Sequence, residues 1–484
     1  MRERAFAVGL ALLISAGSGC YSMRPSSGSG QTAGAGEPRL DPAAVVVPAG
    51  YHVELVAERL NFPVGVALDD QGGIFVVESG YSYGEVFAEP RLLQIRNGGQ
   101  TVVASGGRGG PWTGVALHEG EFIIADGNVL QGGRILRVNR TGQISELVTN
   151  LPSFGDHHTN GPVVGPDGWI YFSQGTATNS GVVGEDNAKF GWLKRRPEFH
   201  DVPGQDITLT GENFPSADAV GANAGRGVQT GAFLPFGVAS QPGQTIRGAV
   251  RASGAVLRVR PAGGEPELVA WGFRNPFGLG FAPDGILYAA DNGYDDRGSR
   301  RVWGAPDIFW RVEPGLWYGW PDYVAGVPIT DPQFRGPGRK PLRFLLANHP
   351  NVPPAPKAKF AVHASADGFD FSRNPAFGFA GQPFVAIFGD QAPDTGKTLA
   401  PIGGRVVRVD LATGVIMDFA VNRAPREGAG SKVGVGGLER PVAARFDPKG
   451  EALYIVDFGV MQMSAKGSEP KQHTGALWRI RRAP

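Results

Sequence analysis

Residues 271–293 read WGFRNPFGLGFAPDGILYAADNG, and this stretch decides the fold. Two short runs of β-favouring residues flank a Pro-Asp-Gly turn, which is the local signature of a β-hairpin. Arg274 and Asn275 precede the first run, and Asp291 follows the second. Because the two ends of an antiparallel hairpin lie side by side opposite its turn, we expect these three side chains at one polar edge.

The same hairpin pattern recurs along the chain. Four further copies are clear and one is looser, at residues 62–78, 112–126, 160–174 and 440–457, with the looser copy at 366–390. Strand signals between the copies complete units of four strands, and such a repeat indicates an array rather than one irregular sheet. We therefore predict an all-β fold, a six-bladed β-propeller.

The ends of the chain predict how the ring closes. The last unit finishes with a strand at 475–480 and lacks a fourth strand. A strand at 51–57 precedes the first unit and has no place in it. Pairing these two strands would complete the last blade and would cover both sheet edges.

The predicted propeller covers residues 45–484 as one domain. Two long insertions, at about 179–253 and 322–363, show no clear periodicity. Long insertions of this kind usually form functional loops on one face, so we predict that they carry specificity. The 484-residue chain is 42% hydrophobic, which is ample for a large core.

The charge balance bears on partners. The formal net charge is +1 and the sequence has no basic block, so there is no electrostatic footprint for a nucleic acid. We therefore expect no nucleic-acid partner. The 74 glycines and 39 prolines fall between apolar runs, where they indicate turns.

The first residues resemble an export signal. Residues 1–20 begin with charged side chains and continue with an apolar run that is too short to span a membrane. Cys20, the only cysteine, falls where a lipoprotein signal would be cleaved and lipidated, although Gly17 departs from that pattern. Ordinary cleavage near 16–18 is the alternative. Residues 21–44, rich in Ser and Gly at their start, are predicted as a flexible linker. The protein is thus expected in the periplasm or cell envelope, with membrane contact only through Cys20.

Polar residues end the second strand of each repeat at the same register. In a ring, equivalent positions point to one face near the axis, so carboxylates would gather in one mouth that suits a hard cation such as Ca²⁺. The alternative is that each acid only satisfies backbone groups at a strand end. These residues are Glu78, Asp126, Gln174, Asp291, Asp457 and, slightly displaced, Asp390.

Two histidines stand in the loop that enters the third hairpin. His157 and His158 follow Asp156, and this loop lies on the same predicted face as Arg274. Histidine titrates near neutrality and a carboxylate can fix its tautomer, so the group suits a general base. A histidine on a surface loop is the alternative.

Three stretches together resemble the soluble glucose/sorbosone dehydrogenases. They are 156–173 (DHHTNGPVVGPDGWIYFS), 272–293 (GFRNPFGLGFAPDGILYAADNG) and 303–321 (WGAPDIFWRVEPGLWYGWP). The resemblance covers the chain from about residue 50 to 484. It implies a six-bladed propeller that uses pyrroloquinoline quinone (PQQ) and Ca²⁺, as in PQQ-dependent aldose sugar dehydrogenases. The expected substrate is an aldose or a similar sugar or aldehyde, and an external acceptor would take the electrons.

By position, the resemblance also implies site residues. His157 would be the general base with Asp156 beside it, and Arg274 would stabilise developing negative charge. Binding of the quinone is implied for Arg274, Asn275, Arg440, Asp457 and Lys397, and binding of Ca²⁺ for the carbonyls of Gly293 and Tyr294.

The chain departs from the family at several positions. Ile308 stands where the family often has a Glu that binds a second Ca²⁺. The usual lysine of the fifth blade is missing from its place, so Lys397 or Lys432 would have to substitute for it. His158 could also take the role assigned to His157.

Two other functions remain open at this stage. A calcium-dependent lactonase of a related propeller type would use the same acid-lined mouth without a quinone. A tethered, non-catalytic propeller that binds carbohydrate or protein is the third alternative, because the fold hosts many functions.

Overall fold

The computed structural model describes residues 38–80, 87–221, 227–392, 395–396, 402–464 and 467–483. The deciding stretch forms strands β19 (Asn275–Phe281) and β20 (Leu287–Asn292), which pair antiparallel. Asn275 lies opposite Asn292, and Pro276 lies opposite Asp291. The polar ends of this hairpin are therefore side by side, as its sequence predicts.

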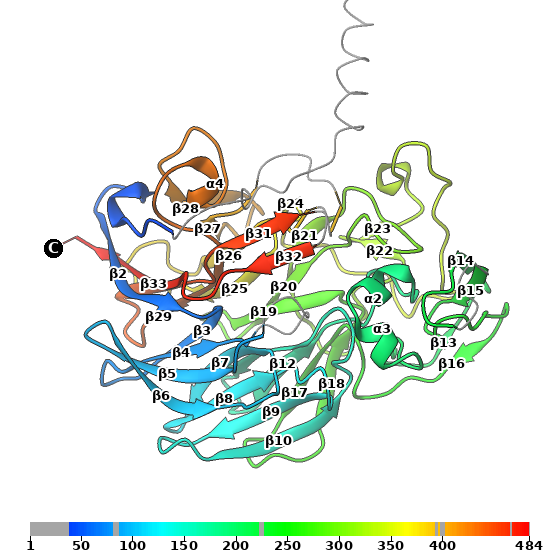
Figure 1. Ribbon diagram of the computed structural model, residues 1–484, viewed down its shortest axis with the longest axis horizontal. Helices are drawn as coiled ribbons and strands as arrows, with labels where there is room; N and C mark the ends of the chain where they lie inside the picture. The colour runs from blue at the N-terminus through cyan, green and yellow to red at the C-terminus, as the bar shows by residue number, and fades with distance from the viewer. Residues whose placement is uncertain are drawn as a thin grey trace, which may run out of the picture.

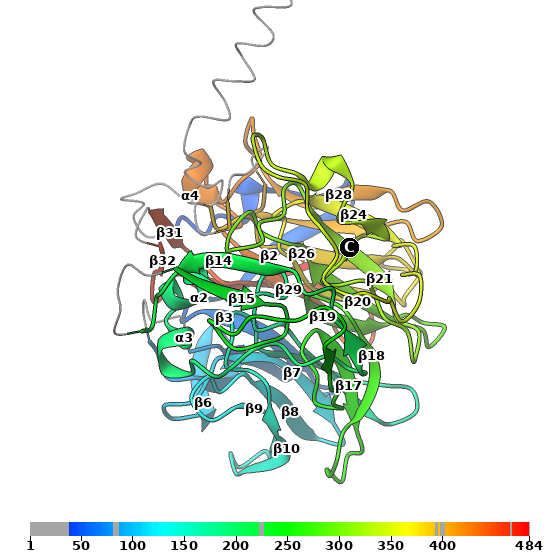
Figure 2. The same cartoon turned by 90° about the vertical axis from the view of Figure 1, so that its right-hand side faces the viewer.

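Six sheets of four or five strands are arranged around a ring (Figures 1 and 2), so the predicted propeller is confirmed. Blades one to three are β3 (Pro63–Leu68), β4 (Ile74–Glu78), β5 (Arg91–Arg96), β6 (Gly99–Ser105); β7 (Trp112–His118), β8 (Glu121–Asp126), β9 (Gly133–Val138), β10 (Ile144–Leu151); and β11 (Thr159–Val164), β12 (Ile170–Gln174), β17 (Ala255–Val259), β18 (Glu267–Trp271). Blades four to six are β19, β20, β21 (Pro306–Arg311), β24 (Ala358–Val362); β25 (Ala366–Phe371), β26 (Pro383–Ile387), β27 (Arg405–Val409), β28 (Ile416–Asn422); and β29 (Pro441–Phe446), β30 (Ala452–Asp457), β33 (Gly475–Arg482), β2 (Tyr51–Leu60).

The ring closes through the N-terminal strands. β2 pairs with β33, with Val53 opposite Ile480, so the expected completion of the last blade is confirmed. The short strand β1 (Val45–Val46) adds a fifth strand to blade five by pairing with β28. The sequence gives no sign of β1, because two residues are too few to show a periodicity.

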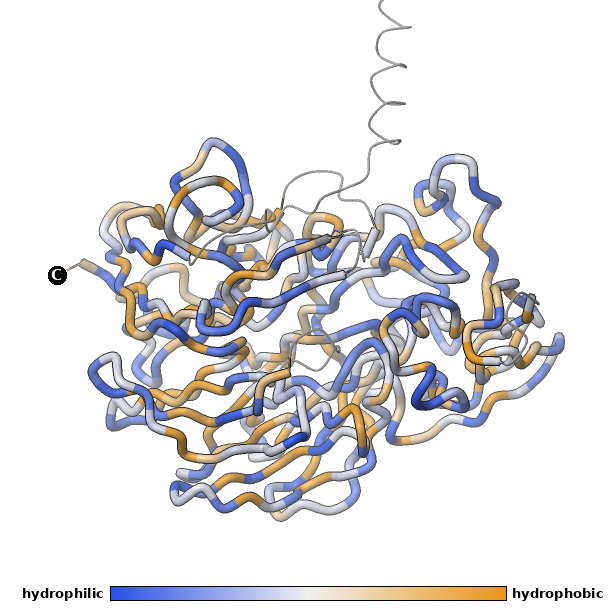
Figure 3. The backbone as a smooth tube through the Cα atoms, in the orientation of Figure 1, coloured by the Kyte–Doolittle hydropathy of each residue, from blue (hydrophilic) through white to orange (hydrophobic). Residues whose placement is uncertain are grey.

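The first strand of each blade lies nearest the axis and contacts the first strands of both neighbours. Hydrophobic stretches run along the strands of the blades (Figure 3) and form the core between them. The approach is close at Gly114, where an added Cβ would lie 1.8 Å from the carbonyl oxygen of Gly161 in the next blade. Only glycine allows the two backbones to come this near.

The two insertions gather on the right-hand side of Figure 1. They carry α2 (Glu185–Lys189), α3 (Trp192–Arg195), β13 (Ile207–Thr208), β14 (Asn213–Ala217), β15 (Gly227–Gly231), β16 (Thr245–Ile246), β22 (Tyr323–Val324), β23 (Val327–Pro328) and η2 (Pro332–Phe334). Strand β24 belongs to blade four, although it falls inside the stretch 322–363 predicted as an insertion.

Other short elements lie outside the regular blades. They are η1 (Pro42–Ala44), α4 (Gly430–Val433) and a hairpin of β31 (Met461–Ser464) and β32 (Gly467–Pro470) between the second and third strands of blade six. No helix in the described ranges is long and apolar enough to cross a bilayer. The export signal with Cys20, and Lys397, lie outside the described residues.

Candidate active site

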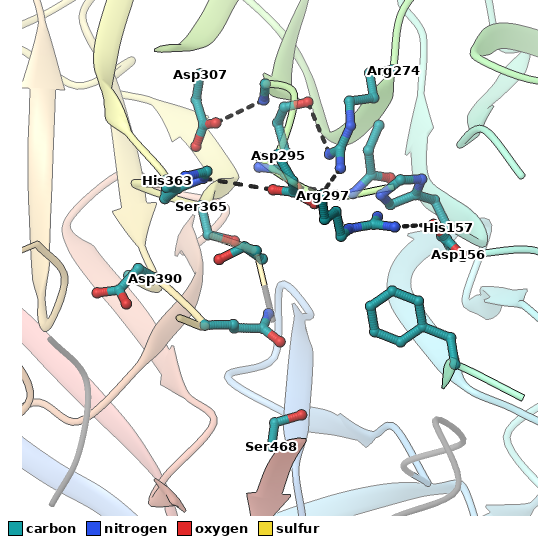
Figure 4. A pocket seen from close by; sticks show the side chains of 17 residues that line it. Asp156, His157, Arg274, Asp295, Arg297, Asp307, His363, Ser365, Asp390 and Ser468 are labelled. Carbon is teal, nitrogen blue, oxygen red and sulfur yellow. Dashed lines mark hydrogen bonds and ion pairs between the residues drawn. The ribbon is translucent and has the colours of Figure 1, made fainter. Parts of the chain in front are cut away.

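Two adjoining cavities, of about 130 Å³ each, lie beside the polar end of the β19–β20 hairpin. Figure 4 shows the side chains that line the first of them. Both are lined by His157, Asn275 and Asn292. The first cavity is otherwise mostly charged, with Asp156, Arg274, Asp295, Arg297, Asp307, His363 and Asp390 in its wall. The second is more apolar, with Val64, Phe277, Phe388, Val442 and Phe458.

His157 is buried in the loop before β11, and its Nδ1 lies 2.8 Å from the carbonyl oxygen of Thr176. A carbonyl oxygen only accepts, so Nδ1 carries the proton and Nε2 keeps its lone pair. Burial lowers the pKa of His157 well below its usual value, and the positive charges of Arg274 and Arg297 lower it further. The imidazole is therefore neutral at neutral pH and able to accept a proton at Nε2.

His158 has a different setting. It lines only the second cavity, whereas His157 lines both. Burial lowers the pKa of His158 to about 4, against the opposing effects of a backbone hydrogen bond at Ser153 and the charge of Asp156. Of the two adjacent histidines, His157 is the one that shares a cavity with Arg274.

Arg274 precedes β19 and its guanidinium is held from behind. Its Nη2 donates to Asp295 over 2.6 Å and to Asn179 Oδ1 over 3.1 Å, and its Nε donates to the Asn179 carbonyl. Among the described residues, its Nη1 has one long contact of 3.4 Å to the carbonyl oxygen of Asn292. Arg274 thus keeps N–H donors for an oxygen in the cavity.

Asp295 is the carboxylate that orients Arg274. Burial alone would raise its pKa, but Arg274, Arg297 and His363 outweigh burial and hold the pKa below its usual value. His363 Nδ1 lies 3.6 Å from Asp295 Oδ1 (Figure 4). Asp295 is therefore ionised, and its carboxylate holds the guanidinium groups of Arg274 and Arg297 in place.

Asn275 belongs to a row of three carboxamides, Asn160, Asn275 and Asn292, which crosses from blade three to blade four. Asn160 donates to Asn275 over 3.1 Å, and Asn275 donates to Asn292 over 2.9 Å. Asn292 in turn donates to the carbonyl of Ala366 and to Asp367 in blade five. Burial raises the pKa of Asp367 well above its usual value. The row fixes which side of Asn275 donates and which accepts.

Asp156 is placed differently from its sequence-based role. Its carboxylate accepts hydrogen bonds from Asn187 in α2, Trp192 in α3 and Arg297, at 3.0, 2.6 and 2.7 Å. The tautomer of His157 is set by Thr176 instead. Asp156 therefore fastens the α2–α3 segment to the wall of the cavity.

Arg297 is the hub of this wall and was missed by sequence reasoning. Its Nη1 donates to Asp156 and Asp186, and its Nε donates to Asp295. The signal that could have found it is the charged run at 295–297, directly after the deciding stretch. His363 was missed too, because a single histidine after an insertion carries no pattern.

Arg440 and Asp457 lie behind the cavity wall. Arg440 is fully buried, and its guanidinium donates to the carbonyls of Phe388, Gly389 and Asp390 at 3.1 to 3.3 Å. Gly389 and Asp390 line the first cavity, whereas Arg440 lines neither. Asp457 accepts the backbone N–H groups of residues 439, 440 and 459. In this structure Arg440 therefore supports the loop after β26, and contact of Arg440 and Asp457 with a quinone stays a prediction.

Gly293 and Tyr294 follow β20, and Gly293 lines the first cavity. The Gly293 N–H donates to Asp307 over 2.7 Å, and the Tyr294 hydroxyl donates to the Tyr323 carbonyl. Within the described ranges, no backbone hydrogen bond ends on the carbonyl oxygens of Gly293 or Tyr294. Such carbonyl oxygens suit a hard cation.

The acid-lined mouth expected at the strand ends does not form. Most of these acids accept hydrogen bonds from the backbone and from an Arg or Trp of the neighbouring strand, as Asp126 does from Arg134 and Asp291 from Trp310. Of the acids at the strand ends, only Asp390 lines the first cavity. In the part of the chain that the structure describes, no three His, Cys, Asp or Glu side chains are grouped to hold a metal.

The departures noted in the sequence have these positions. Ile308 is buried in β21 opposite Asp291, so its side chain belongs to the core. Lys432 in α4 is partly buried, which lowers its pKa, and Arg426 lowers it further while Asp390 opposes the shift.

Comparison with solved structures identifies the fold. The PQQ domain of a pyranose dehydrogenase from Coprinopsis cinerea, solved in its holo form, is 16% identical, covers 93% of this chain and 100% of its own, and has a TM-score of 0.53. A family AA12 carbohydrate-active enzyme from Trichoderma reesei, a calcium structure, is 16% identical over 93% and 99% of the chains with a TM-score of 0.52. A putative oxidoreductase (glucose dehydrogenase) from Thermus thermophilus is 18% identical over 89% and 100%, with a TM-score of 0.51.

The chain shares its fold with these proteins. At 16–18% identity the likeness speaks for the fold alone. No family model and no curated protein sequence matches the chain.

The residues of the two cavities fit a quinone with a cation. Arg274 and Asn275 offer N–H donors, and the Gly293 carbonyl offers an oxygen ligand. The phenyl rings of the second cavity, from Phe277, Phe388 and Phe458, supply apolar surface. A flat aromatic anion needs this combination of apolar walls and a polar rim.

Proposed function

We propose that the protein is a quinone-dependent sugar dehydrogenase, with PQQ and Ca²⁺ as cofactors and an aldose or a similar sugar or aldehyde as substrate. One observation carries the proposal: His157, neutral and with the lone pair on Nε2, lines the same cavity as Arg274, Asn275 and Gly293. The fold shared with a PQQ domain of a pyranose dehydrogenase supports the choice of cofactor.

When bound, PQQ would supply a two-electron hydride acceptor, and Ca²⁺ would supply a Lewis acid beside it. His157 Nε2 would accept the proton of the substrate hydroxyl as the C–H bond breaks and the C=O bond forms. The substrate thus loses one hydride and one proton, and an external acceptor later removes the two electrons.

Three further groups prepare the site for this step. Arg274 would donate from Nη1 to an oxygen on which negative charge develops, and Asp295 keeps the guanidinium in place. Asn275 would present a donor in a direction fixed by its neighbours in the carboxamide row. The carbonyls of Gly293 and Tyr294 would hold the cation.

The test of the function is reconstitution. Purified protein is loaded with PQQ and Ca²⁺, and dye reduction is measured over a panel of aldoses and aldehydes. We expect turnover that depends on the quinone. Hydrolysis of lactones without quinone would instead support the lactonase, and inactivity in both assays would support the binding propeller.

A pair of adjacent variants tests the base. His157→Ala should lower kcat by about 10² to 10⁴-fold, because general-base catalysis contributes this much. Its affinity for PQQ, measured by absorbance titration, should change little. His158→Ala is the comparison variant, and a larger loss of kcat there than in His157→Ala would reassign the base to His158.

We also propose that the protein is exported to the periplasm or cell envelope and is lipid-anchored through Cys20. The support is the signal-like sequence of residues 1–20. Cys20→Ala should move the expressed protein from the membrane fraction to the soluble fraction, as measured by fractionation and immunoblotting. An unchanged distribution would leave ordinary signal cleavage as the better explanation.

A further inference from the structure

The first cavity combines a polar wall with a single aromatic side chain. Among the described residues that line it, Phe190 contributes the only phenyl or indole ring, and the others are charged, polar or glycine. Phe190 is partly buried and directly follows α2, in the first insertion. A cavity with one apolar surface among hydrogen-bonding groups suits a ligand that is itself apolar on one side only.

The ring of Phe190 is held in place by Arg297. The guanidinium carbon of Arg297 lies 4.8 Å from the ring centroid, which is a cation–π contact. Arg297 cannot move easily, because it is buried and donates to three carboxylates at 2.6 to 2.9 Å. One face of the Phe190 ring is therefore covered by a fixed cation.

The helix before Phe190 is fixed to the same group. Asp186 and Asn187, both in α2, bind Arg297 and Asp156 respectively. Asn187 also accepts from the N–H of Gly184, which closes the start of the helix. The Phe190 side chain is therefore already ordered before a ligand binds, so binding costs little of its conformational entropy.

Groups that can bind hydroxyls face the same cavity. Asp307, His363 and Gln391 line it together with Phe190. A cyclic sugar carries hydroxyls around its rim and C–H groups on its faces, and those C–H groups are attracted to the electron-rich face of an aromatic ring. An open-chain aldehyde of three carbons has no such ring face.

We propose that Phe190 is the wall on which the ring of a cyclic aldose stacks, so that the enzyme selects closed sugar rings over small open-chain aldehydes. This inference rests on the proposed function and names the substrate class of the same site. The Asp156–Arg297 connection is what holds the wall in position.

The test compares Phe190→Ala and Phe190→Leu with Phe236→Ala. Phe190 and Phe236 are both partly buried and pack on the same cluster around Trp192, but only Phe190 lines the first cavity. In the quinone-loaded enzyme, Phe190→Ala should raise KM for cyclic aldoses by about three- to tenfold with kcat nearly unchanged. KM for glyceraldehyde, which is too short to close into a furanose or pyranose ring, should stay the same. Phe190→Leu keeps the bulk and the fold and should show the same selective change, while Phe236→Ala should show none.

A binding measurement gives a second readout. Calorimetry with a 1,5-anhydro sugar, a closed ring without the oxidisable hydroxyl, should show the same loss of affinity in both Phe190 variants. If the wild type oxidises sugars and neither variant changes KM or this affinity, the inference is overturned while the proposed function stands. An equal rise of KM for glyceraldehyde would also overturn it. A wild type without quinone-dependent turnover would remove the proposed function itself.

Discussion

Blades four and six carry the same three residues at matching places. In blades four and six respectively, Arg274 and Arg440 stand before the first strand, Asp291 and Asp457 lie within the last two residues of the second strand, and Trp310 and Trp478 lie on the third. In both blades the aspartate accepts the backbone N–H of the arginine and the indole N–H of the tryptophan. The repeat thus builds the same strand ends twice.

The two arginine side chains nevertheless have different partners. Arg274 reaches the first cavity and binds Asp295, which belongs to the loop after its own second strand. Arg440 is fully buried and binds three backbone carbonyls of blade five. The repeat therefore determines the course of the backbone, whereas the partners outside the repeated strands determine what each arginine side chain does.

The largest expected effect is on catalysis, and it should separate the two arginines. Arg274→Ala should lower kcat by about 10² to 10³-fold, because it removes a preorganised donor to the developing charge. Dye reduction by the quinone-loaded variant measures this. An equal loss of kcat in correctly folded Arg440→Ala would contradict the different roles of the two arginines.

The free energy of unfolding should be lowered more by removal of Arg440 than by removal of Arg274. Arg440→Ala leaves three buried carbonyls without their donor and should cost about 3 kcal/mol or more of unfolding free energy. Arg274→Ala leaves Asp295 still paired with Arg297, so a smaller loss is expected. Urea denaturation of the two variants decides this, and equal midpoints would contradict the different roles.

The two arginines should also differ in their effect on the pH dependence of kcat/KM. Arg274 lowers the pKa of His157, so its removal should raise that pKa and move the acid limb of kcat/KM to higher pH. Arg274→Gln removes the charge with the least change of size. The shift should be absent in Arg440→Gln, and a limb that moves in neither variant would remove His157 as the titrating base.

The smallest expected effect concerns the shared feature. Trp310→Phe and Trp478→Phe each remove one hydrogen bond to a buried aspartate and should cost about 1 kcal/mol each. Thermal unfolding of both variants measures the two losses. Clearly unequal values would show that the strand ends of blades four and six are not equivalent.

Much of the fold could be predicted from sequence because it is a local pattern repeated. Each hairpin carries its own turn and its own apolar runs, as in 271–293, and the closure of the ring follows from one unmatched strand. Strand β24 escaped notice because it follows a proline-rich stretch inside an insertion. β24 is recognised as a strand of blade four by its pairing with β21, and its own sequence does not show this.

The grouping of the candidate site residues could be predicted where the repeat itself places them. His157, Arg274, Asn275 and Gly293 lie at or next to the ends of hairpin strands, and the fold alone brings them to one cavity. The partners of other side chains come from elsewhere. Asp156 meets a helix of the insertion, and Arg440 meets carbonyls of another blade. Backbone carbonyls leave no trace in a sequence, so such partners need the structure.

The N-terminal segment is paired to two different blades, and this has a mechanical consequence. β1 and β2 are the outermost strands of blades five and six. A pull on the chain ahead of Val45 would therefore enter the ring at its rim, first through the β1–β28 pair and then through the β2–β33 pair. His157 and Arg274, which lie just before the inner strands β11 and β19, would experience this force only after both strand pairs had separated.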